Sequence, residues 1–247
     1  MRISRLYLQA DYIAGQTLEL SKEQAHYVLT VLRLKNGTVI EAFNGKGMVA
    51  RGQILITSRR SANVLIEELL DIQNESPLET ILVQGISRGD RMDYSIQKAV
   101  ELGISAIQPV FTQRCEVKLK ADKLEKRQQQ WQTIVINACE QSGRNVVPKV
   151  LPIIDFNQWL EQQESDLFGL VMDPCAENTL ASVAKPNRST PVYILVGPEG
   201  GLTDDEIKIS TNAGFNTVQL GPRILRTETA GPATLAIIQA LWGDFCL

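Results

Sequence analysis

The sequence predicts a chain of two domains, a small β-rich domain followed by an α/β domain built on a mainly parallel sheet. Residues 38–70 alternate apolar and polar side chains, as half-buried strands do. From residue 78 onward, short apolar runs alternate with segments of helical period, which favours parallel strands covered by helices on both faces. A length of 247 residues, with 44% hydrophobic and 21% charged side chains, is enough for two modest cores.

The N-terminal domain is expected over residues 1–72. Its strands are "TVIEAF", "GMVARGQILI" and "ANVLIEELL", with hairpin signals at Asn36-Gly37 and in the turn at residues 44–47. The segment "DIQNESP", residues 71–77, ends in proline and predicts a linker. The second domain is therefore expected over residues 73–247.

The second domain is expected to alternate strands and helices along its whole length. The continuously apolar run "LETILVQGI" predicts a buried strand, and the next segment places Met92, Ile96, Ala99 and Val100 on one helical face before Gly103. In chain order, we expect strands at 78–86, 104–111, 168–173, 192–197 and 217–221, and helices over 91–102, 121–142, 204–213 and about 229–242.

Composition narrows the classes of function. The net charge is −3, but residues 1–72 and 88–149 are basic while residues 150–247 are acidic, so local binding of nucleic acid stays open beside simple solvation. The four cysteines form no Cys-x-x-Cys pair, and the one histidine, His26, cannot build a histidine metal cluster. No apolar run is long enough for a signal peptide or a membrane span. We expect a cytoplasmic protein that uses neither a metal nor a membrane.

The turn "GPEGG", residues 197–201, is one of two unusual connections that follow predicted strands. It lacks the lysine of a nucleotide-triphosphate loop and the glycine spacing of a dinucleotide fingerprint. Glu199 would repel phosphate and suit a ligand with positive charge. A purely structural alternative is a tight turn followed by a capping box, Thr203 with Glu206, that starts the next helix.

The second connection, "GPRILRTETA", spans residues 221–230. It places Ile224 and Leu225 in the middle of a loop, between Arg223 and Arg226. Folded over a flat ligand, the two apolar side chains would form a wall. Alternatively, they plug the core below the last helix, whose first turn then includes Glu228.

Together, the two connections resemble the paired cofactor motifs of the SPOUT class of RNA methyltransferases. Within that class the chain is most similar to the bacterial family that methylates N3 of a uridine in small-subunit (16S) ribosomal RNA. The blocks "SRGDRMDYSIQKAVELGI", "RCEVKL" and "NACEQSGRNVVP" carry the same resemblance, as does "HYVLTVLRLKNGTVIEAFNGKG" near the N-terminus. The resemblance covers nearly the whole chain.

This resemblance implies a PUA-like β-barrel that binds RNA, followed by a methyltransferase domain whose C-terminal segment threads a trefoil knot. It also implies a homodimer, S-adenosylmethionine as the cofactor, and 16S ribosomal RNA within the small subunit as the partner. General topology rules disfavour knots, so the knot depends on the resemblance alone. The residues it implies for cofactor binding are Leu195, Gly197, Pro198, Glu199, Gly200, Gly201, Leu220, Gly221, Ile224, Leu225, Thr227 and Thr229.

Arg226 and Glu228 are the expected catalytic residues. A guanidinium is always protonated, so Arg226 could stabilise negative charge on the uracil oxygens but could not act as a base. The base is left open between Glu228, water and a group from the second subunit. The residues expected to contact RNA are Arg2, Arg5, Arg33, Lys35, Arg88, Arg91, Arg114, Lys118, Lys120 and Arg144.

Two features depart from the family pattern, and two other functions stay open. Gly231-Pro232 follows "TETA", which predicts a slightly shifted helix start, and residues 174–191 show no strong pattern. The alternatives are a SPOUT methyltransferase that modifies another nucleotide, such as a ribose 2′-hydroxyl, and a non-catalytic RNA-binding factor for ribosome assembly. The sequence does not identify the exact nucleotide.

Overall fold

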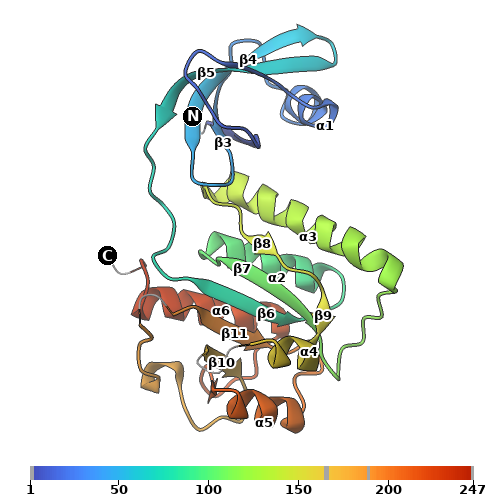
Figure 1. Cartoon of the computed structure of the whole chain (residues 1–247), viewed down its shortest axis with the longest axis vertical. Helices are drawn as coiled ribbons and strands as arrows, with labels where there is room; N and C mark the ends of the chain where they lie inside the picture. The colour runs from blue at the N-terminus through green and yellow to red at the C-terminus, as the bar shows by residue number, and fades with distance from the viewer. Residues whose placement is uncertain (1–2, 164–166, 188–189, 246–247) are drawn as a thin grey trace. The chain divides into compact units, whose positions relative to one another are not determined.

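The computed structural model describes residues 3–163, 167–187 and 190–245 (Figure 1). The chain divides into two compact units. The first consists of Met1–Glu75 together with Cys139–Val147, and the second of Ser76–Ala138 together with Pro148–Leu247. The first unit therefore includes nine residues from the middle of the chain, Cys139–Val147, in addition to the expected N-terminal segment.

The first unit is built on a five-stranded sheet in the order β1-β3-β4-β5-β2. All neighbours are antiparallel except β1 and β3, which run parallel. A short helix, α1 (Lys22–His26), continues into the π-helical turn η1 (Tyr27–Val31). The strands are β1 (Ser4–Tyr7), β2 (Thr17–Glu19), β3 (Val39–Phe43), β4 (Val49–Ser58) and β5 (Ser61–Leu70).

The alternation of apolar and polar side chains explains why β3, β4 and β5 form strands. The prediction of these three strands is confirmed. Ile54 of β4 lies opposite Val64 of β5, and both are fully buried in a core that also includes Ile40 and Ile66. The helix α1 begins at a capping box in which the Ser21 hydroxyl accepts the backbone N–H of Gln24.

Residues 139–147 belong to the first unit because their polar groups bind its N-terminal segment. The Glu140 carboxylate accepts the backbone N–H of Tyr7 at 3.0 Å. The Arg5 guanidinium donates to Asn145 Oδ1 at 2.7 Å and to the carbonyl of Arg144 at 3.0 Å. Burial raises the pKa of the Glu140 carboxyl, although the N–H of Tyr7 opposes this effect. These contacts join segments more than 130 residues apart.

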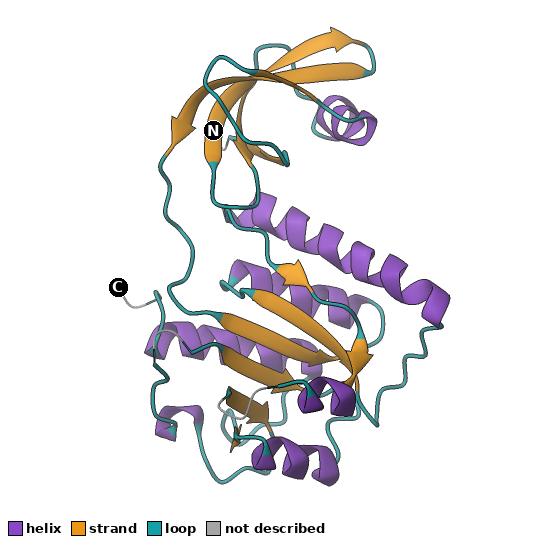
Figure 2. Ribbon diagram, viewed as in Figure 1, coloured by secondary structure: helices purple, strands orange, loops and turns teal. Residues whose placement is uncertain are grey.

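The second unit contains a seven-stranded sheet in which every pair is parallel, in the order β12-β10-β11-β6-β7-β8, with β9 also paired to β7 (Figure 2). This confirms the predicted mainly parallel sheet. Its strands are β6 (Thr80–Gly85), β7 (Ala106–Phe111), β8 (Lys149–Val150), β9 (Ile154–Asp155), β10 (Phe168–Met172), β11 (Val192–Val196) and β12 (Phe215–Val218).

Helices cover both faces of this sheet. Ile81 and Val83 of β6 share a buried cluster with Phe156 and Trp159 of α4. The intervening Leu82 points to the other face, where it lies against Gly231 of α6, and α6 packs on α2. The helical segments are α2 (Asp90–Glu101), α3 (Ala121–Ser142), α4 (Phe156–Glu161), η2 (Leu180–Ser182), α5 (Asp204–Asn212) and α6 (Thr227–Leu241).

Among the elements that were predicted, the differences lie mainly near the C-terminus, and β1, β2, β8, β9 and α4 were not predicted. The last strand is Phe215–Val218 rather than 217–221, and α6 begins at Thr227, two residues before its expected start. Pro232 therefore lies inside α6, where it has no N–H to offer the carbonyl of Glu228. The trefoil knot stays a prediction. None of the helices in the described ranges is long and apolar enough to cross a membrane.

Candidate active site

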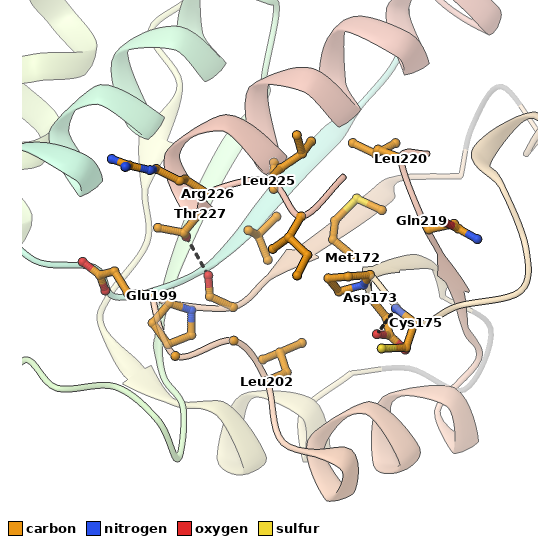
Figure 3. Close-up of a pocket in the computed structure, with 18 of the residues that line it drawn as sticks. Met172, Asp173, Cys175, Glu199, Leu202, Gln219, Leu220, Leu225, Arg226 and Thr227 are labelled. Atoms are coloured by element: carbon orange, nitrogen blue, oxygen red, sulfur yellow. Dashed lines mark hydrogen bonds between the residues drawn. The ribbon is translucent and has the colours of Figure 1, made fainter. Parts of the chain in front are cut away.

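A cavity of about 650 Å³ lies where three neighbouring parallel strands end (Figure 3). The segments 172–175, 196–202 and 218–228 each begin with the last residue of a strand, β10, β11 and β12 respectively, and members of all three line the cavity. Open α/β sheets bind ligands at such carboxyl ends. The cavity therefore occupies the position that the strand pattern predicts.

The turn at 197–201 needs glycine because the backbone is tightly packed around it. A Cβ on Gly197 would lie 2.8 Å from the backbone of Gly201, and a Cβ on Gly85 would lie 2.6 Å from Cδ of Pro198. Gly201 has φ +70°, a conformation that favours glycine. The result is a cradle of backbone groups along one wall of the cavity.

The predicted capping box after this turn is confirmed. The Thr203 hydroxyl accepts the backbone N–H of Glu206 at 3.2 Å, and the Glu206 carboxylate accepts the N–H of Thr203 at 2.8 Å. Glu206 also accepts the backbone N–H of Gln113 at 2.7 Å. The helix cap and the lining of the cavity are therefore two properties of the same turn, not alternatives.

Glu199 is already paired with positive charge within the chain. Its carboxylate accepts the backbone N–H of Arg88 at 2.9 Å and the Arg91 guanidinium at 3.0 Å. Partial burial raises the pKa of this carboxyl, but the N–H groups of Arg88 and of Glu199 itself, with Arg91, outweigh burial and hold the pKa below its ordinary value. Glu199 is thus an anion that ties the glycine turn to the start of α2.

Thr227, the first residue of α6, fastens the second connection to the first. Its hydroxyl donates to the carbonyl of Gly197 at 2.6 Å, drawn as a dashed line in Figure 3, and accepts the side-chain amide of Gln84 at 3.0 Å. Thr227 and Gln84 are both buried. One hydroxyl therefore links β6, the turn after β11 and the N-terminus of α6.

Ile224 and Leu225 line the cavity and do not plug the core together. The Ile224 side chain is 84% exposed, although large apolar residues are usually covered. Leu225 is partly buried and is labelled in the upper middle of the close-up (Figure 3). The alternative of a core plug is therefore wrong for Ile224, and an apolar wall at the cavity explains both positions.

Arg226 and Glu228 differ in their surroundings. Arg226 is exposed, caps the start of α6, and forms no ion pair within the part of the chain that the structure describes. Glu228 is mostly buried, and its Oε1 lies 4.0 Å from Nε of Arg91. Its Oε2 is fully buried and accepts no hydrogen bond from the described residues, which leaves a carboxylate oxygen free to accept one.

The structure places most of the expected cofactor residues around the cavity. Leu195 is an exception, because it is fully buried in the core between the sheet and the helix α4. Thr229 is the other, because it is exposed on α6 away from the lining. The expected residues that line the cavity are Gly197, Pro198, Glu199, Gly200, Gly201, Leu220, Gly221, Ile224, Leu225 and Thr227.

The segment after β10 also lines the cavity, although no role was predicted for it. Asp173 and Cys175 lie at the opposite end from Glu199 and Arg226 in Figure 3, and Asp173 accepts the backbone N–H of Cys175 at 2.9 Å. The rule that strand ends carry sites would have found this segment if the place of β10, between β11 and β12, had been known. The main residues missed are Met172, Asp173, Pro174, Cys175, Leu202 and Gln219.

The basic residues of the second unit that were expected to contact RNA divide into two groups. Arg91 and Arg114 line the cavity, and Arg114 donates to the carbonyls of Gly200 and Leu202 at 3.1 and 3.0 Å, so it supports the glycine turn. The others lie on the surface: Arg88, which pairs with Glu116, Lys118 and Lys120.

In the first unit, the structure separates surface arginines from structural ones. Arg33 and Lys35 are exposed. Arg5 is largely buried, pairs with Glu41 and lies over the ring of Phe43 at 4.9 Å. Its guanidinium is therefore used within the fold.

Arg144 is also buried, and its guanidinium donates to the Glu75 carboxylate at 2.6 Å. The expectation that Arg5 and Arg144 contact RNA is not supported by these positions, because neither guanidinium faces solvent. Arg2 lies outside the described residues. Within the described ranges, no group of three or more His, Cys, Asp or Glu side chains is arranged to hold a metal ion.

Comparisons with known proteins agree with this geometry. A family model described as an RNA methyltransferase domain matches residues 74–239, and one described as an RNA methyltransferase PUA domain matches residues 20–67. Among curated proteins, the ribosomal RNA small subunit methyltransferase E of Buchnera aphidicola subsp. Schizaphis graminum is 35% identical, over 98% of this chain and 98% of that protein. The protein of the same name from Synechocystis is also 35% identical, over 96% of this chain and 77% of that protein.

Solved structures extend the similarity to three dimensions. The ribosomal RNA small subunit methyltransferase E of Neisseria gonorrhoeae, bound to S-adenosylmethionine, is 43% identical, with a TM-score of 0.92 over 99% of this chain and all of that one. A putative methyltransferase of Legionella pneumophila in complex with the same cofactor is 37% identical, with a TM-score of 0.93 over 99% of this chain and 100% of that one. The cavity, the two matched domains and the similarity over the full length lead to one conclusion: the chain belongs to the ribosomal RNA small subunit methyltransferase E family.

Proposed function

We propose that this enzyme transfers a methyl group from S-adenosylmethionine to N3 of a uridine in small-subunit (16S) ribosomal RNA. The observation that carries the proposal is the cavity after β10, β11 and β12, where the exposed Arg226 and the carboxylate-bearing Glu228 line the same space as an apolar wall. The membership of the family supplies the reaction and the class of substrate. The specific atom, N3, follows from the resemblance of the two connections.

The cavity suits S-adenosylmethionine in size and chemistry. A volume of about 650 Å³ is within the usual range for small-molecule sites, roughly 300–1,000 Å³. The exposed Ile224 and the partly buried Leu225 provide apolar cover for an adenine ring, and the glycine turn at Gly197 and Gly201 lines the cavity with backbone groups. When bound, the cofactor supplies an electrophilic methyl group and a sulfonium that keeps the electron pair of the broken carbon–sulfur bond.

We assign roles in cofactor binding to side chains and backbone separately. Leu220, Ile224 and Leu225 enclose the adenine, and the backbone groups of Gly197 and Gly201 form hydrogen bonds to it and to the ribose. Thr227 holds the carbonyl of Gly197 in place rather than contacting the ligand. Glu199 anchors the turn through Arg88 and Arg91.

Arg226 and Glu228 are assigned to the uracil. The N3–H group is a weak acid, and N3 becomes a nucleophile as its proton leaves, while negative charge spreads to the two ring carbonyls. The Arg226 guanidinium stabilises this charge, since it is exposed at the cavity and has no other anionic partner among the described residues. The Glu228 carboxylate, which lines the cavity, accepts the proton. Methyl transfer also requires that the bound uracil ring is held with N3 in line with the methyl group of the cofactor.

We assign RNA docking to the PUA domain, residues 1–72, and methyl transfer to residues 73–247. The exposed Arg33 and Lys35 then contact phosphates of the small-subunit RNA, and a cytoplasmic location follows from that substrate. We also propose a homodimer. The large apolar side chains of Tyr94, Ile237 and Leu241 on α2 and α6 are exposed by 49%, 37% and 47%, and a second copy would cover them.

Labelled S-adenosylmethionine tests the proposed substrate. The protein is incubated with small and with large ribosomal subunits from cells that lack the enzyme, and the label in each RNA is counted. We expect label in the small-subunit RNA only. Equal label in both RNAs would contradict the proposal, and so would the absence of label from both, which a non-catalytic assembly factor would give.

A further inference from the structure

A second cavity of about 350 Å³ lies in the methyltransferase domain beside the first. It is lined by the loop after β6, by residues 117–119 after β7, and by the first half of α3. Ile86 and Trp131 are fully buried at its base, and Val117 and Leu119 are partly buried. The apolar surface open to a ligand is therefore that of Val117 and Leu119, and we call these two side chains the apolar floor.

Three basic side chains of α3 also line this cavity. Lys123 and Lys126 are exposed, and neither forms an ion pair within the described part of the chain. Arg127 lies over the Trp131 ring at 5.1 Å, and its guanidinium is 3.8 Å from the Asp93 carboxylate. We call Lys123, Lys126 and Arg127 the basic rim. An apolar floor with a basic rim suits a ligand that has a flat ring and a phosphate.

The charged side chains that line the second cavity are all basic, whereas Asp122 and Glu125 of α3 are exposed beside it. Lys118 and Lys120 are exposed on the segment that carries Val117 and Leu119. Glu116, on the same segment, is paired with Arg88, and the Trp131 indole N–H donates to Asp93 at 3.2 Å. Glu116 and Asp93 are therefore already matched by donors of the chain, whereas the lysines are not.

The loop after β6 lines the second cavity and contacts residues that line the first. Ser87 lines the second cavity, and its hydroxyl lies 3.4 Å from the hydroxyl of Thr227, which lines the first. The next residue, Arg88, donates its N–H to Glu199 of the first cavity. A ligand in the second cavity would therefore lie next to the site where the target base is modified.

We propose that the second cavity binds a nucleotide that flanks the target uridine in the RNA strand. Its base lies on the apolar floor and its phosphate contacts Lys123 and Lys126. The proposal rests on the proposed function, because it assumes that RNA enters the first cavity. The volume fits: about 350 Å³ is near the lower end of the range for small-molecule sites, roughly 300–1,000 Å³.

The test compares two double variants of the full-length protein with equal loss of charge. K123Q/K126Q removes the proposed phosphate contacts, and K149Q/K208Q removes two exposed lysines of β8 and α5 that line neither cavity. The measured quantity is the Kd of a short fluorescein-labelled oligouridylate, by anisotropy, at several salt concentrations. For K123Q/K126Q we expect a Kd about tenfold higher and a salt dependence weaker by about 1.5 in slope, as two lost phosphate contacts imply. K149Q/K208Q should match the wild type.

Leu119→Ala tests the apolar floor. Because a base contact releases no counterions, this variant should raise the Kd about threefold without changing the salt slope. Affinity for S-adenosylmethionine, measured by calorimetry, should be unchanged in all variants, which shows that they fold.

Two results would overturn the nucleotide site. One is equal binding by K123Q/K126Q and K149Q/K208Q, and the other is an unchanged Kd for Leu119→Ala. Failure of the proposed function would be seen separately, as absence of methyl transfer by the wild-type protein, because the binding assay needs no transfer.

Discussion

At the scale of single residues, Arg226 carries the clearest prediction. Its side chain is exposed and unpaired among the described residues, so Arg226→Ala should leave the free energy of unfolding within about 0.5 kcal/mol of the wild type. Loss of one group that stabilises charge in a transition state lowers kcat by about 100-fold or more. The affinity of this variant for S-adenosylmethionine should be unchanged. Single-turnover methylation and calorimetry measure the two quantities, and a normal rate would exclude the assigned role.

Glu199 predicts a dependence of stability on pH. Its pKa lies below the ordinary value of 4.5 in the folded protein, so its charged contacts stabilise the fold above that value and are lost as the pH falls through the lowered pKa. Glu199→Gln should therefore lower the urea midpoint at pH 7 and have a smaller effect at pH 3. The exposed Glu177→Gln is the control. A difference of the same size at both pH values would exclude the predicted contribution.

Residue chemistry alone predicted the cavity better than it predicted the RNA surface. Both unusual connections line the cavity. This could be predicted because apolar side chains and clustered glycines have few other roles in a loop. The roles of the arginines were harder to predict, because an arginine can serve equally well on the surface and in a buried ion pair. Arg5 and Arg144 find Glu41, Glu75 and Asn145 only after the chain has folded.

At the scale of elements, the start of α6 is held by one hydroxyl. Thr227→Val keeps the shape of the side chain but leaves the carbonyl of Gly197 and the amide of Gln84 without this partner. Each lost hydrogen bond costs about 1 kcal/mol, so the free energy of unfolding should fall by about 2 kcal/mol, and cofactor affinity should fall as the glycine turn loosens. Thr229→Val, at an exposed position of the same helix, should change neither. Urea unfolding and calorimetry check both; equal effects of the two variants would contradict this assignment.

Elements with a long periodic pattern were predictable, and short ones were not. Helix α3 matches the expected range, 121–142, because its apolar period persists over many turns. The strands β8 and β9 contain two residues each, too few to show alternation, and their pairing with β7 is set by the tertiary fold. The early start of α6 was missed because its first turn is stabilised by contacts with β6 and the turn after β11, not by its own sequence.

At the scale of the whole molecule, the first unit depends on residues 139–147. Arg144→Gln removes a guanidinium from the Glu75 carboxylate, which also accepts the backbone N–H of Asn145 at 2.9 Å. The free energy of unfolding should fall by about 2 kcal/mol. The salt slope of oligouridylate binding should not change, in contrast to K123Q/K126Q. A changed slope with normal stability would restore Arg144 as an RNA contact.

The central claim is that this molecule places the methyl group on N3 of a uridine. Small-subunit RNA labelled by the enzyme is digested to nucleosides, and the labelled nucleoside is identified by chromatography and mass spectrometry. The account predicts label in N3-methyluridine from the wild type, and label reduced about 100-fold or more with Arg226→Ala. Label in a ribose-methylated nucleoside, or in any other base, would contradict it.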